Sequence, residues 1–163
     1  MHEDHIHRVG LGTDVHRLEA GGPLRLGGVE IPFERHLLGH SDGDVVLHAV
    51  TDAVCGAAGL PDIGELFPDS DPRYAGCDSR DLLVDVVEKM RALGYAVVNV
   101  DVVIHAERPK LSAYKPAIRA SLAEGLDTAM DRVSIKAKTG EGLDAVGRGE
   151  AMGCTAIVGL KKL

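Results

Sequence analysis

The sequence predicts a layer of β-sheet covered by helices, of the α/β or α+β class. Segments with strand periodicity alternate with segments of helix periodicity along the chain, and a length of 163 residues favours a single domain. Hydrophobic residues make up 45% of the chain but aromatic residues only 3%, and there are 20 glycines. We therefore expect a core of aliphatic side chains packed closely around glycines.

The first strand is predicted at residues 7–15, where apolar residues alternate with small or polar ones. Asp14 and His16 then point to the same side of the strand end, because strand side chains repeat every second residue. Residues 24–32 are typical of a β-hairpin that turns at Gly27 and Gly28.

The first helix is predicted at residues 45–59, with Asp42 or Asp44 of the preceding polar loop as its cap. His48 and Asp52 are four residues apart and share a face that is separate from the apolar one. This face therefore offers a metal ligand and a carboxylate that could orient that ligand or a neighbour.

Prolines, a glycine and aspartates make residues 60–72 a loop, whose length is typical of a functional segment. An amphipathic helix follows at 79–93 and ends at Gly94. The valine-rich strand after it suggests burial on both faces. The remaining elements are, in order, this strand at 95–106, a helix at 116–126 and strands at 132–138 and 151–160.

Charge and composition exclude several classes of function. The net charge of -7 disfavours nucleic-acid binding, and no apolar run approaches the length of about 18 residues that a membrane span needs. Three widely spaced cysteines, Cys55, Cys77 and Cys154, fit reduced thiols and a cytoplasmic location. Residues 1–8 lack a signal-peptide core and are expected to be a flexible N-terminal extension, followed by one domain at 9–163.

Asp14, His16 and His48 are the donor set of a catalytic zinc site, in which three protein ligands leave a fourth position open. A structural zinc site would more often use cysteines, and the chain has no C-x-x-C pair. The alternative is that Asp14 caps a turn and both histidines are ordinary polar residues.

Three further groups could bind phosphate, metal or hydroxyl groups. Lys138 and Thr139 could bind phosphate while Glu141 holds a Mg²⁺ ion on a diphosphate. The G-R-G-E segment at 147–150 could place Arg148 against a phosphate. The loop 62–71 carries carboxylates that could recognise hydroxyl groups. Ordinary turn chemistry is the alternative explanation for each of these groups.

Several motifs occur in order along the chain: G-x-D-x-H, H-S-D-G-D-x-x-x-H, T-D-A, D-I-G-x-x-F-P-D-x-D, A-x-x-P-K and G-R-G-E. Each is weak alone, but the ordered set resembles the 2-C-methyl-D-erythritol 2,4-cyclodiphosphate synthase family. The resemblance runs from about Arg8 to the C-terminus and leaves out only the N-terminal extension.

The resemblance implies an α+β fold with a four-stranded mixed sheet and helices packed on one face. It implies a homotrimer with active sites at subunit interfaces. It also implies a lyase of the non-mevalonate isoprenoid pathway. This enzyme would convert 4-diphosphocytidyl-2-C-methyl-D-erythritol 2-phosphate to 2-C-methyl-D-erythritol 2,4-cyclodiphosphate and release CMP.

The resemblance also implies a role for individual residues. Zn²⁺ or another divalent transition metal would bind Asp14, His16 and His48, whereas Mg²⁺ or Mn²⁺ would bind Glu141 and the diphosphate. His40 and Thr139 would be catalytic. The substrate-binding residues would be Asp14, His16, His40, Ser41, Asp62, Ile63, Gly64, Phe67, Pro68, Asp69, Ser70, Asp71, Ala106, Pro109, Lys110, Leu111, Lys138, Thr139, Gly140, Glu141 and Arg148.

Two other functions compete with this one. A zinc-dependent phosphoesterase would use the same ligands to activate water, and a non-catalytic trimer could bind an isoprenoid diphosphate in an axial cavity near Arg148 and Glu150. The sequence also departs from the family pattern in one place, because Ala145 stands where the family often has an aromatic residue.

Overall fold

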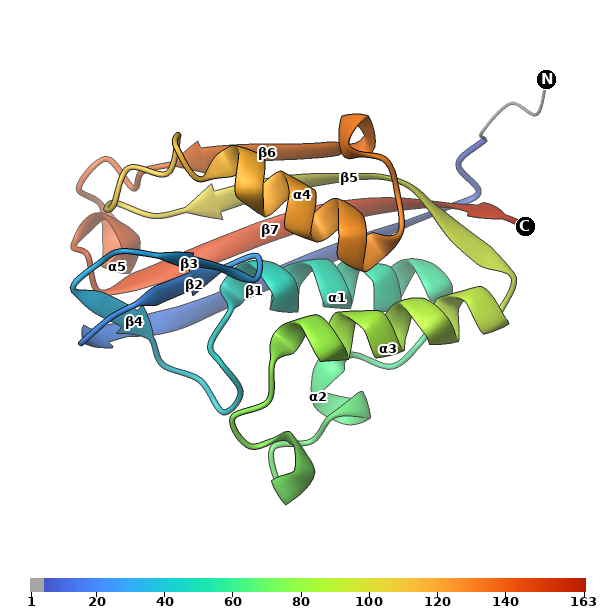
Figure 1. The fold of residues 1–163 in the computed structure, drawn as a ribbon, viewed down its shortest axis with the longest axis horizontal. Helices are drawn as coiled ribbons and strands as arrows, with labels where there is room; N and C mark the ends of the chain where they lie inside the picture. The colour runs from blue at the N-terminus through green and yellow to red at the C-terminus, as the bar shows by residue number, and fades with distance from the viewer. Residues whose placement is uncertain (1–4) are drawn as a thin grey trace.

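The structure, a computed structural model, describes residues 5–163. Its main sheet has the strand order β4-β1-β7-β5-β6, and β2 and β3 form a separate two-stranded sheet (Figure 1). The strands are β1 (Arg8–Ala20), β2 (Leu24–Leu26), β3 (Val29–Ile31), β4 (Arg35–Leu37), β5 (Tyr95–His105), β6 (Val133–Lys138) and β7 (Ala151–Lys162). The helices are α1 (Val45–Ala58), α2 (Ile63–Leu66), α3 (Ser79–Ala92), α4 (Lys115–Leu126) and α5 (Asp144–Gly147), with short 3₁₀ helices η1 (Pro72–Tyr74) and η2 (Met130–Arg132).

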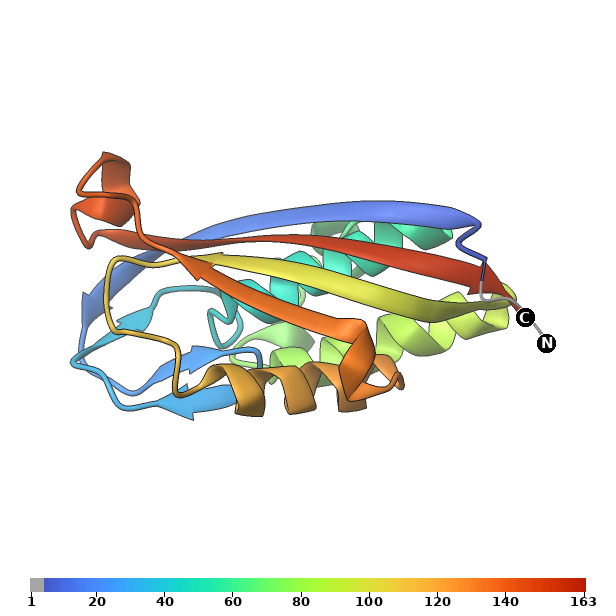
Figure 2. The same ribbon diagram turned by 90° about the horizontal axis from the view of Figure 1, so that it is seen from above.

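The sheet is mixed, because β6 runs parallel to β5 while the other pairs are antiparallel. Figure 2 shows α1, α3 and α4 beneath one face of the sheet, as predicted. The expectation of four strands was wrong, since the main sheet has five. The additional strand is β4, which has only three residues and pairs with the far end of β1, beyond the predicted end of that strand.

Other boundaries also differ from the prediction. Of the predicted extension, residues 1–4 lie outside the described part of the chain, whereas Arg8 already belongs to β1 and the backbone N–H of His7 donates to Leu160 O. The loop 60–72 contains α2 and the start of η1, and α5 was not anticipated. In β5 only every second residue is fully buried along most of the strand, so this chain covers one face of the strand and not both.

Two glycines of β1 let helix α1 lie directly on the sheet. A Cβ atom at Gly10 would come within 1.8 Å of Ala53 O, and one at Gly12 within 1.9 Å of Ala49 O. Both obstacles are backbone atoms, which cannot rotate away. The close approach therefore needs glycine at both positions, and it brings the N-terminal half of α1 next to the part of β1 that carries Asp14.

Asp44 fixes the start of α1. Its side chain is fully buried and accepts hydrogen bonds from the backbone N–H groups of Leu47, Gly27 and Gly28, at 3.0, 2.8 and 2.7 Å. One carboxylate thus caps the helix and holds the turn of the β2–β3 hairpin. Of the two aspartates that the sequence offered as caps, Asp44 caps α1.

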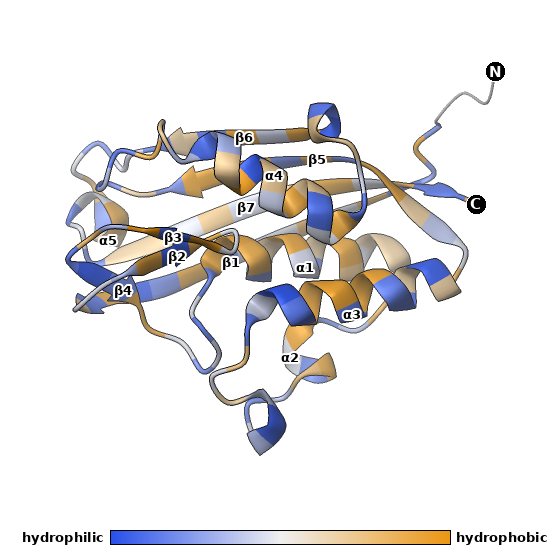
Figure 3. Ribbon diagram, viewed as in Figure 1, coloured by the Kyte–Doolittle hydropathy of each residue, from blue (hydrophilic) through white to orange (hydrophobic). Residues whose placement is uncertain are grey.

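The core consists of aliphatic side chains from α1, α3, α4 and the inner face of the sheet, as the composition predicts. Figure 3 shows hydrophobic residues along α1 and mixed colouring along α3, which lies farther out. All three cysteines are free thiols, as expected, and Cys55 and Cys154 are buried whereas Cys77 is partly exposed. Among the described residues, no helix is both long and apolar enough to cross a membrane.

Candidate metal centre

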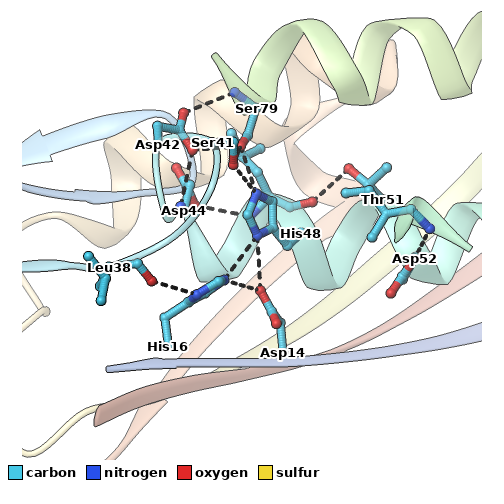
Figure 4. A network of polar contacts seen from close by, with 12 residues as sticks. Asp14, His16, Leu38, Ser41, Asp42, Asp44, His48, Thr51, Asp52 and Ser79 are labelled. Atoms are coloured by element: carbon cyan, nitrogen blue, oxygen red, sulfur yellow. Dashed lines mark hydrogen bonds and ion pairs between the residues drawn. The ribbon is translucent and has the colours of Figure 1, made fainter. Parts of the chain in front are cut away.

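Asp14, His16 and His48 converge at one point between β1 and α1 (Figure 4). Asp14 Oδ2 lies 2.8 Å from His16 Nε2 and 3.0 Å from His48 Nδ1, and the two histidine nitrogens are 3.2 Å apart. The strand supplies two of the side chains from one face, and the close packing of α1 on the strand supplies the third. Within the described residues, this is the one cluster of at least three such side chains whose ligand atoms come together.

The hydrogen bond on the side of the His16 ring away from the cluster indicates where the ring proton resides. His16 Nδ1 lies 2.9 Å from the backbone oxygen of Leu38, which can only accept, so Nδ1 carries the proton. His16 Nε2 therefore presents a lone pair to the cluster. Because Asp14 is an acceptor as well, lone pairs face one another at the centre unless a cation lies between them.

The geometry suits a metal ion. Ligand atoms at about 2.0–2.1 Å from a tetrahedral ion lie roughly 3.3 Å from one another. The separations of 2.8, 3.0 and 3.2 Å approach this value. Two imidazoles and a carboxylate are a donor set for zinc and similar divalent transition metals, and three protein ligands leave a position for a substrate oxygen.

The charges in the cluster reinforce one another. A proton, like a metal ion, can lie between these acceptor atoms. Burial by itself raises the pKa of Asp14, but hydrogen bonds from protonated His16 and His48, and their positive charge, lower it to about 2. The hydrogen bond to Asp14 raises the pKa of His16, against the opposing effect of burial. The site thus keeps a carboxylate anion and attracts positive charge to it.

The cluster opens into a cavity of about 240 Å³ that holds many of the residues predicted to bind substrate. His40 and Ser41 come from the loop before α1, and the opposite wall comes from the segment around α2. The residues predicted to bind substrate that line this cavity are Asp14, His16, His40, Ser41, Ile63, Gly64, Phe67 and Asp69, and His48 of the cluster lines it as well.

Other predicted residues of this loop have structural contacts. Asp62 caps α2 by accepting from Glu65 N at 2.9 Å, and Asp71 caps η1 and pairs with Arg73. Pro68 and Ser70 do not line the cavity. The prediction missed Tyr74, Cys77 and Leu82, which do. The signal available for these three residues was their apolar or aromatic character in the segment that follows the polar loop 60–72.

Asp52 organises this wall of the cavity. Its Oδ1 accepts a hydrogen bond of 2.8 Å from the backbone N–H of Ile63, the first residue of α2. Burial raises the pKa of Asp52, against the effect of that hydrogen bond. Of the two roles that the sequence offered, Asp52 therefore orients a neighbouring loop, and among the described residues no hydrogen bond joins it to Asp14, His16 or His48.

The remaining predicted residues gather elsewhere. A second cavity, of about 610 Å³, lies at the ends of β5 and β6 and is lined by Ala106, Pro109, Lys110, Leu111, Lys138 and Thr139, among others. Gly140 donates its N–H to Glu107 at 2.8 Å, which fixes the loop after β6, and Glu141 is exposed on that loop. Arg148 lies at a third cavity and pairs with Glu150.

One chain does not bring the two main cavities together. The sheet register runs across one row from Val15 through Gly153 and His105 to Lys138, so Lys138 is three strands, roughly 14 Å, away from the strand of the metal ligands. Lys138 belongs to the exposed face of β6, whereas Asp14 and His16 belong to the helix-covered face of β1. The catalytic pair predicted at His40 and Thr139 is likewise split between the two cavities.

Comparison with known proteins gives a consistent result. The model of the YgbB family matches residues 7–161. The chain is 52% identical over 155 residues to 2-C-methyl-D-erythritol 2,4-cyclodiphosphate synthase of Cronobacter sakazakii, covering 95% of this chain and 98% of that protein. It is 54% identical over 150 residues to the protein of the same name from Bordetella avium, covering 92% and 93%.

Solved structures agree with the sequence relatives. A 2C-methyl-D-erythritol-2,4-cyclodiphosphate synthase described as its CDP-bound form superimposes with a TM-score of 0.88 and 41% identity, covering 94% of this chain and 100% of that one. The bifunctional IspDF of Campylobacter jejuni gives a TM-score of 0.92 and 42% identity, over 96% of this chain and 42% of the larger one.

Proposed function

The chain belongs to the YgbB family of 2-C-methyl-D-erythritol 2,4-cyclodiphosphate synthases, and we propose that Asp14, His16 and His48 hold the divalent metal ion used in its reaction. It is a lyase of isoprenoid biosynthesis. It converts 4-diphosphocytidyl-2-C-methyl-D-erythritol 2-phosphate to 2-C-methyl-D-erythritol 2,4-cyclodiphosphate and releases CMP. The observation that carries the metal assignment is the set of acceptor atoms that converge within 2.8–3.2 Å.

The reaction needs little covalent chemistry from the protein. The 2-phosphate of the substrate attacks the β-phosphorus of the diphosphate, the bond from that phosphorus to the CMP oxygen breaks, and CMP leaves. The nucleophile is already an anion, so no side chain has to remove a proton from it. Catalysis then consists of positioning and charge neutralisation.

A metal ion on the three ligands, which we take to be Zn²⁺, would polarise an oxygen of the diphosphate and offset its charge. His40 and Ser41 line the same cavity, where they would contact a phosphate held on the metal. Gly64 and Phe67 form the wall that would enclose the methylerythritol part. These roles agree with the positions of the residues around the cavity.

A second copy of the chain would complete the site. Lys138 and Thr139 line the other cavity, and Lys138 belongs to the face of the sheet opposite the metal ligands of its own chain. The outer face of the sheet also carries exposed apolar side chains at Val9, Leu11, Val15 and Ile157. We propose a homotrimer that covers this face and joins the metal cavity of one subunit to the cavity lined by Lys138 and Thr139 of the next.

Three smaller assignments belong to the same proposal. Glu141 is exposed on the loop beside Thr139, where it could bind Mg²⁺ or Mn²⁺ together with the diphosphate. Arg148 and Glu150 are an exposed pair near the outer face, where an axial cavity of the trimer could accept an isoprenoid diphosphate. The three free cysteines support a cytoplasmic location.

Product analysis tests the function against the phosphoesterase alternative. The protein is incubated with the diphosphocytidyl substrate, with and without a chelator, and the products are identified by ³¹P NMR. We expect one cyclic diphosphate per CMP, loss of both products with chelator, and recovery with added zinc. Free phosphate or an open-chain monophosphate in place of the ring would overturn the assignment.

Subunit mixing tests the shared site. His48→Ala and Lys138→Ala each damage a different cavity, so each variant alone should have little activity. If one site uses both cavities from different subunits, mixed oligomers regain part of the activity because some interfaces contain both intact halves. No recovery in oligomers that are shown to be mixed would contradict the proposal.

A further inference from the structure

His48 presents its two ring nitrogens to different groups. Nδ1 faces the metal cluster, whereas Nε2 lies 2.8 Å from Ser79 Oγ and 3.0 Å from Ser41 Oγ (Figure 4). A neutral imidazole has one N–H and one lone pair, and only the lone pair can bind a metal. The metal site therefore works only if something keeps the proton on Nε2.

Ser79 has a fixed hydrogen-bond direction. Its hydroxyl lies 2.6 Å from Asp42 Oδ1, and its backbone N–H donates to Asp42 Oδ2 at 2.9 Å. A carboxylate accepts only, so the single hydroxyl proton of Ser79 is directed to Asp42. Ser79 Oγ then faces His48 with lone pairs, and His48 must be the donor in that contact.

We propose that Asp42 and Ser79 are positioning residues that set the tautomer of His48. The Asp42 carboxylate accepts a hydrogen bond from the Ser79 hydroxyl, Ser79 Oγ accepts one from the N–H of His48 Nε2, and the lone pair of His48 Nδ1 is left facing the metal. This inference rests on the metal site proposed above and adds two residues that do not touch the metal or the substrate phosphates. The backbone oxygen of Leu38 does the same for His16.

Burial and location make Ser79 suitable for this role. Ser79 is 1% exposed, so water does not compete for its hydroxyl. It is the first residue of α3, while Asp42 precedes α1 and also accepts a 3.1 Å hydrogen bond from Asp44 N. The chain from carboxylate to imidazole thus connects the starts of both helices to the metal site.

Ser41 is the competing partner of His48 Nε2. Its hydroxyl is 3.0 Å from that nitrogen and 3.4 Å from Ser79 Oγ, but in the structure no carboxylate fixes the direction of its proton. Ser41 could donate to His48 as readily as accept from it. Comparing zinc affinity in Ser79→Ala and Ser41→Ala therefore shows which of the two serines controls the tautomer of His48.

The experiment measures the tautomer directly and zinc affinity separately. Protein labelled with ¹⁵N at histidine is loaded with zinc, and long-range ¹H–¹⁵N spectra assign the protonated nitrogen of His48. Zinc affinity is measured by competition with a chromophoric chelator for the wild type, Ser79→Ala, Asp42→Asn and Ser41→Ala. Circular dichroism and thermal unfolding check that each variant is folded.

We expect an Nε2–H tautomer with Nδ1 on zinc in the wild type. Zinc affinity should fall about 10- to 100-fold in Ser79→Ala and Asp42→Asn, and less than 3-fold in Ser41→Ala. An Nδ1–H or Nε2-bound His48 in the wild type would overturn the inference even if the variants did not fold, as would unchanged zinc affinity in folded Ser79→Ala. A wild type that binds no zinc would instead refute the metal site itself.

Discussion

Replacing Gly12 by alanine should loosen the metal centre from a distance. The added Cβ would lie 1.9 Å from Ala49 O and 2.7 Å from Ala53 N, both backbone atoms of α1. Real Cβ atoms essentially never come closer than 3.0 Å, so β1 and α1 must separate by about 1.1 Å or more at this point. His48 precedes Ala49, and its Nδ1 would then lie about 4 Å from Asp14 Oδ2, farther than the roughly 3.3 Å that a shared tetrahedral ion requires.

Both stability and zinc affinity should therefore decrease. Overpacking of this kind costs about 1–3 kcal/mol, which with a urea m-value of about 2 kcal/mol/M lowers the unfolding midpoint by roughly 1 M. Zinc affinity should fall at least about 10-fold, as for other changes that displace a ligand. Urea unfolding in the presence of chelator and chelator competition measure the two effects at one fixed protein concentration.

Gly56→Ala is the matched control, because Gly56 is in the same helix and faces the same strand. Its added Cβ would meet Gly10 Cα at 3.8 Å and Leu11 O at 4.0 Å, which are ordinary contacts. Alanine in place of glycine inside a helix stabilises it by about 0.5–1 kcal/mol. Equal effects of the two substitutions, or a Gly12→Ala protein with the stability and zinc affinity of the wild type, would refute the close-packing argument.

Three further predictions concern other parts of the chain. Asp44→Ala should destabilise the fold by about 3–5 kcal/mol, because it removes the cap of α1 and the acceptor for two N–H groups of the hairpin turn. Asp62→Ala, which removes an exposed helix cap, should cost less than about 1 kcal/mol. Equal urea midpoints for the two variants would contradict this prediction. A thiol reagent should modify Cys77 in the cavity first, because burial raises the pKa of Cys55 to about 12, and equal labelling of both by mass spectrometry would count against it. The hydrogen bond from Arg80 lowers the pKa of Asp78 in the folded protein below the unfolded value. The stability that Asp78 contributes is therefore present above about pH 4 and is lost as the pH falls through the lower folded pKa. In Asp78→Asn the free energy of unfolding should fall less steeply with decreasing pH, and an unchanged pH dependence would contradict the shift.

The cluster of Asp14, His16 and His48 could be predicted from the sequence because its signals are local. Asp14 and His16 are two residues apart on a strand, and His48 lies on a helix whose apolar face is clear from its periodicity. The hairpin turn and the ends of α3 and α4 follow from glycines and from helical spacing in the same way. Each of these features depends on a few neighbouring residues, which is what periodicity can detect.

The missed features depend on contacts between distant parts of the chain. Strand β4 is too short to show alternation and exists because β1 continues far enough to pair with it. The need for Gly12 becomes visible only when α1 lies on β1. Asp42 and Ser79 are 37 residues apart, and nothing in either segment indicates that their side chains are hydrogen-bonded. The split between the two cavities likewise follows from the strand order.

The most direct test of the metal assignment is anomalous diffraction from crystals of the zinc-loaded protein, collected on both sides of the zinc absorption edge. We predict one strong anomalous peak per chain at the cluster, about 2.0–2.1 Å from Asp14 Oδ2, His16 Nε2 and His48 Nδ1. The absence of a peak there, or a zinc ion that is bound without these three atoms, would contradict the account.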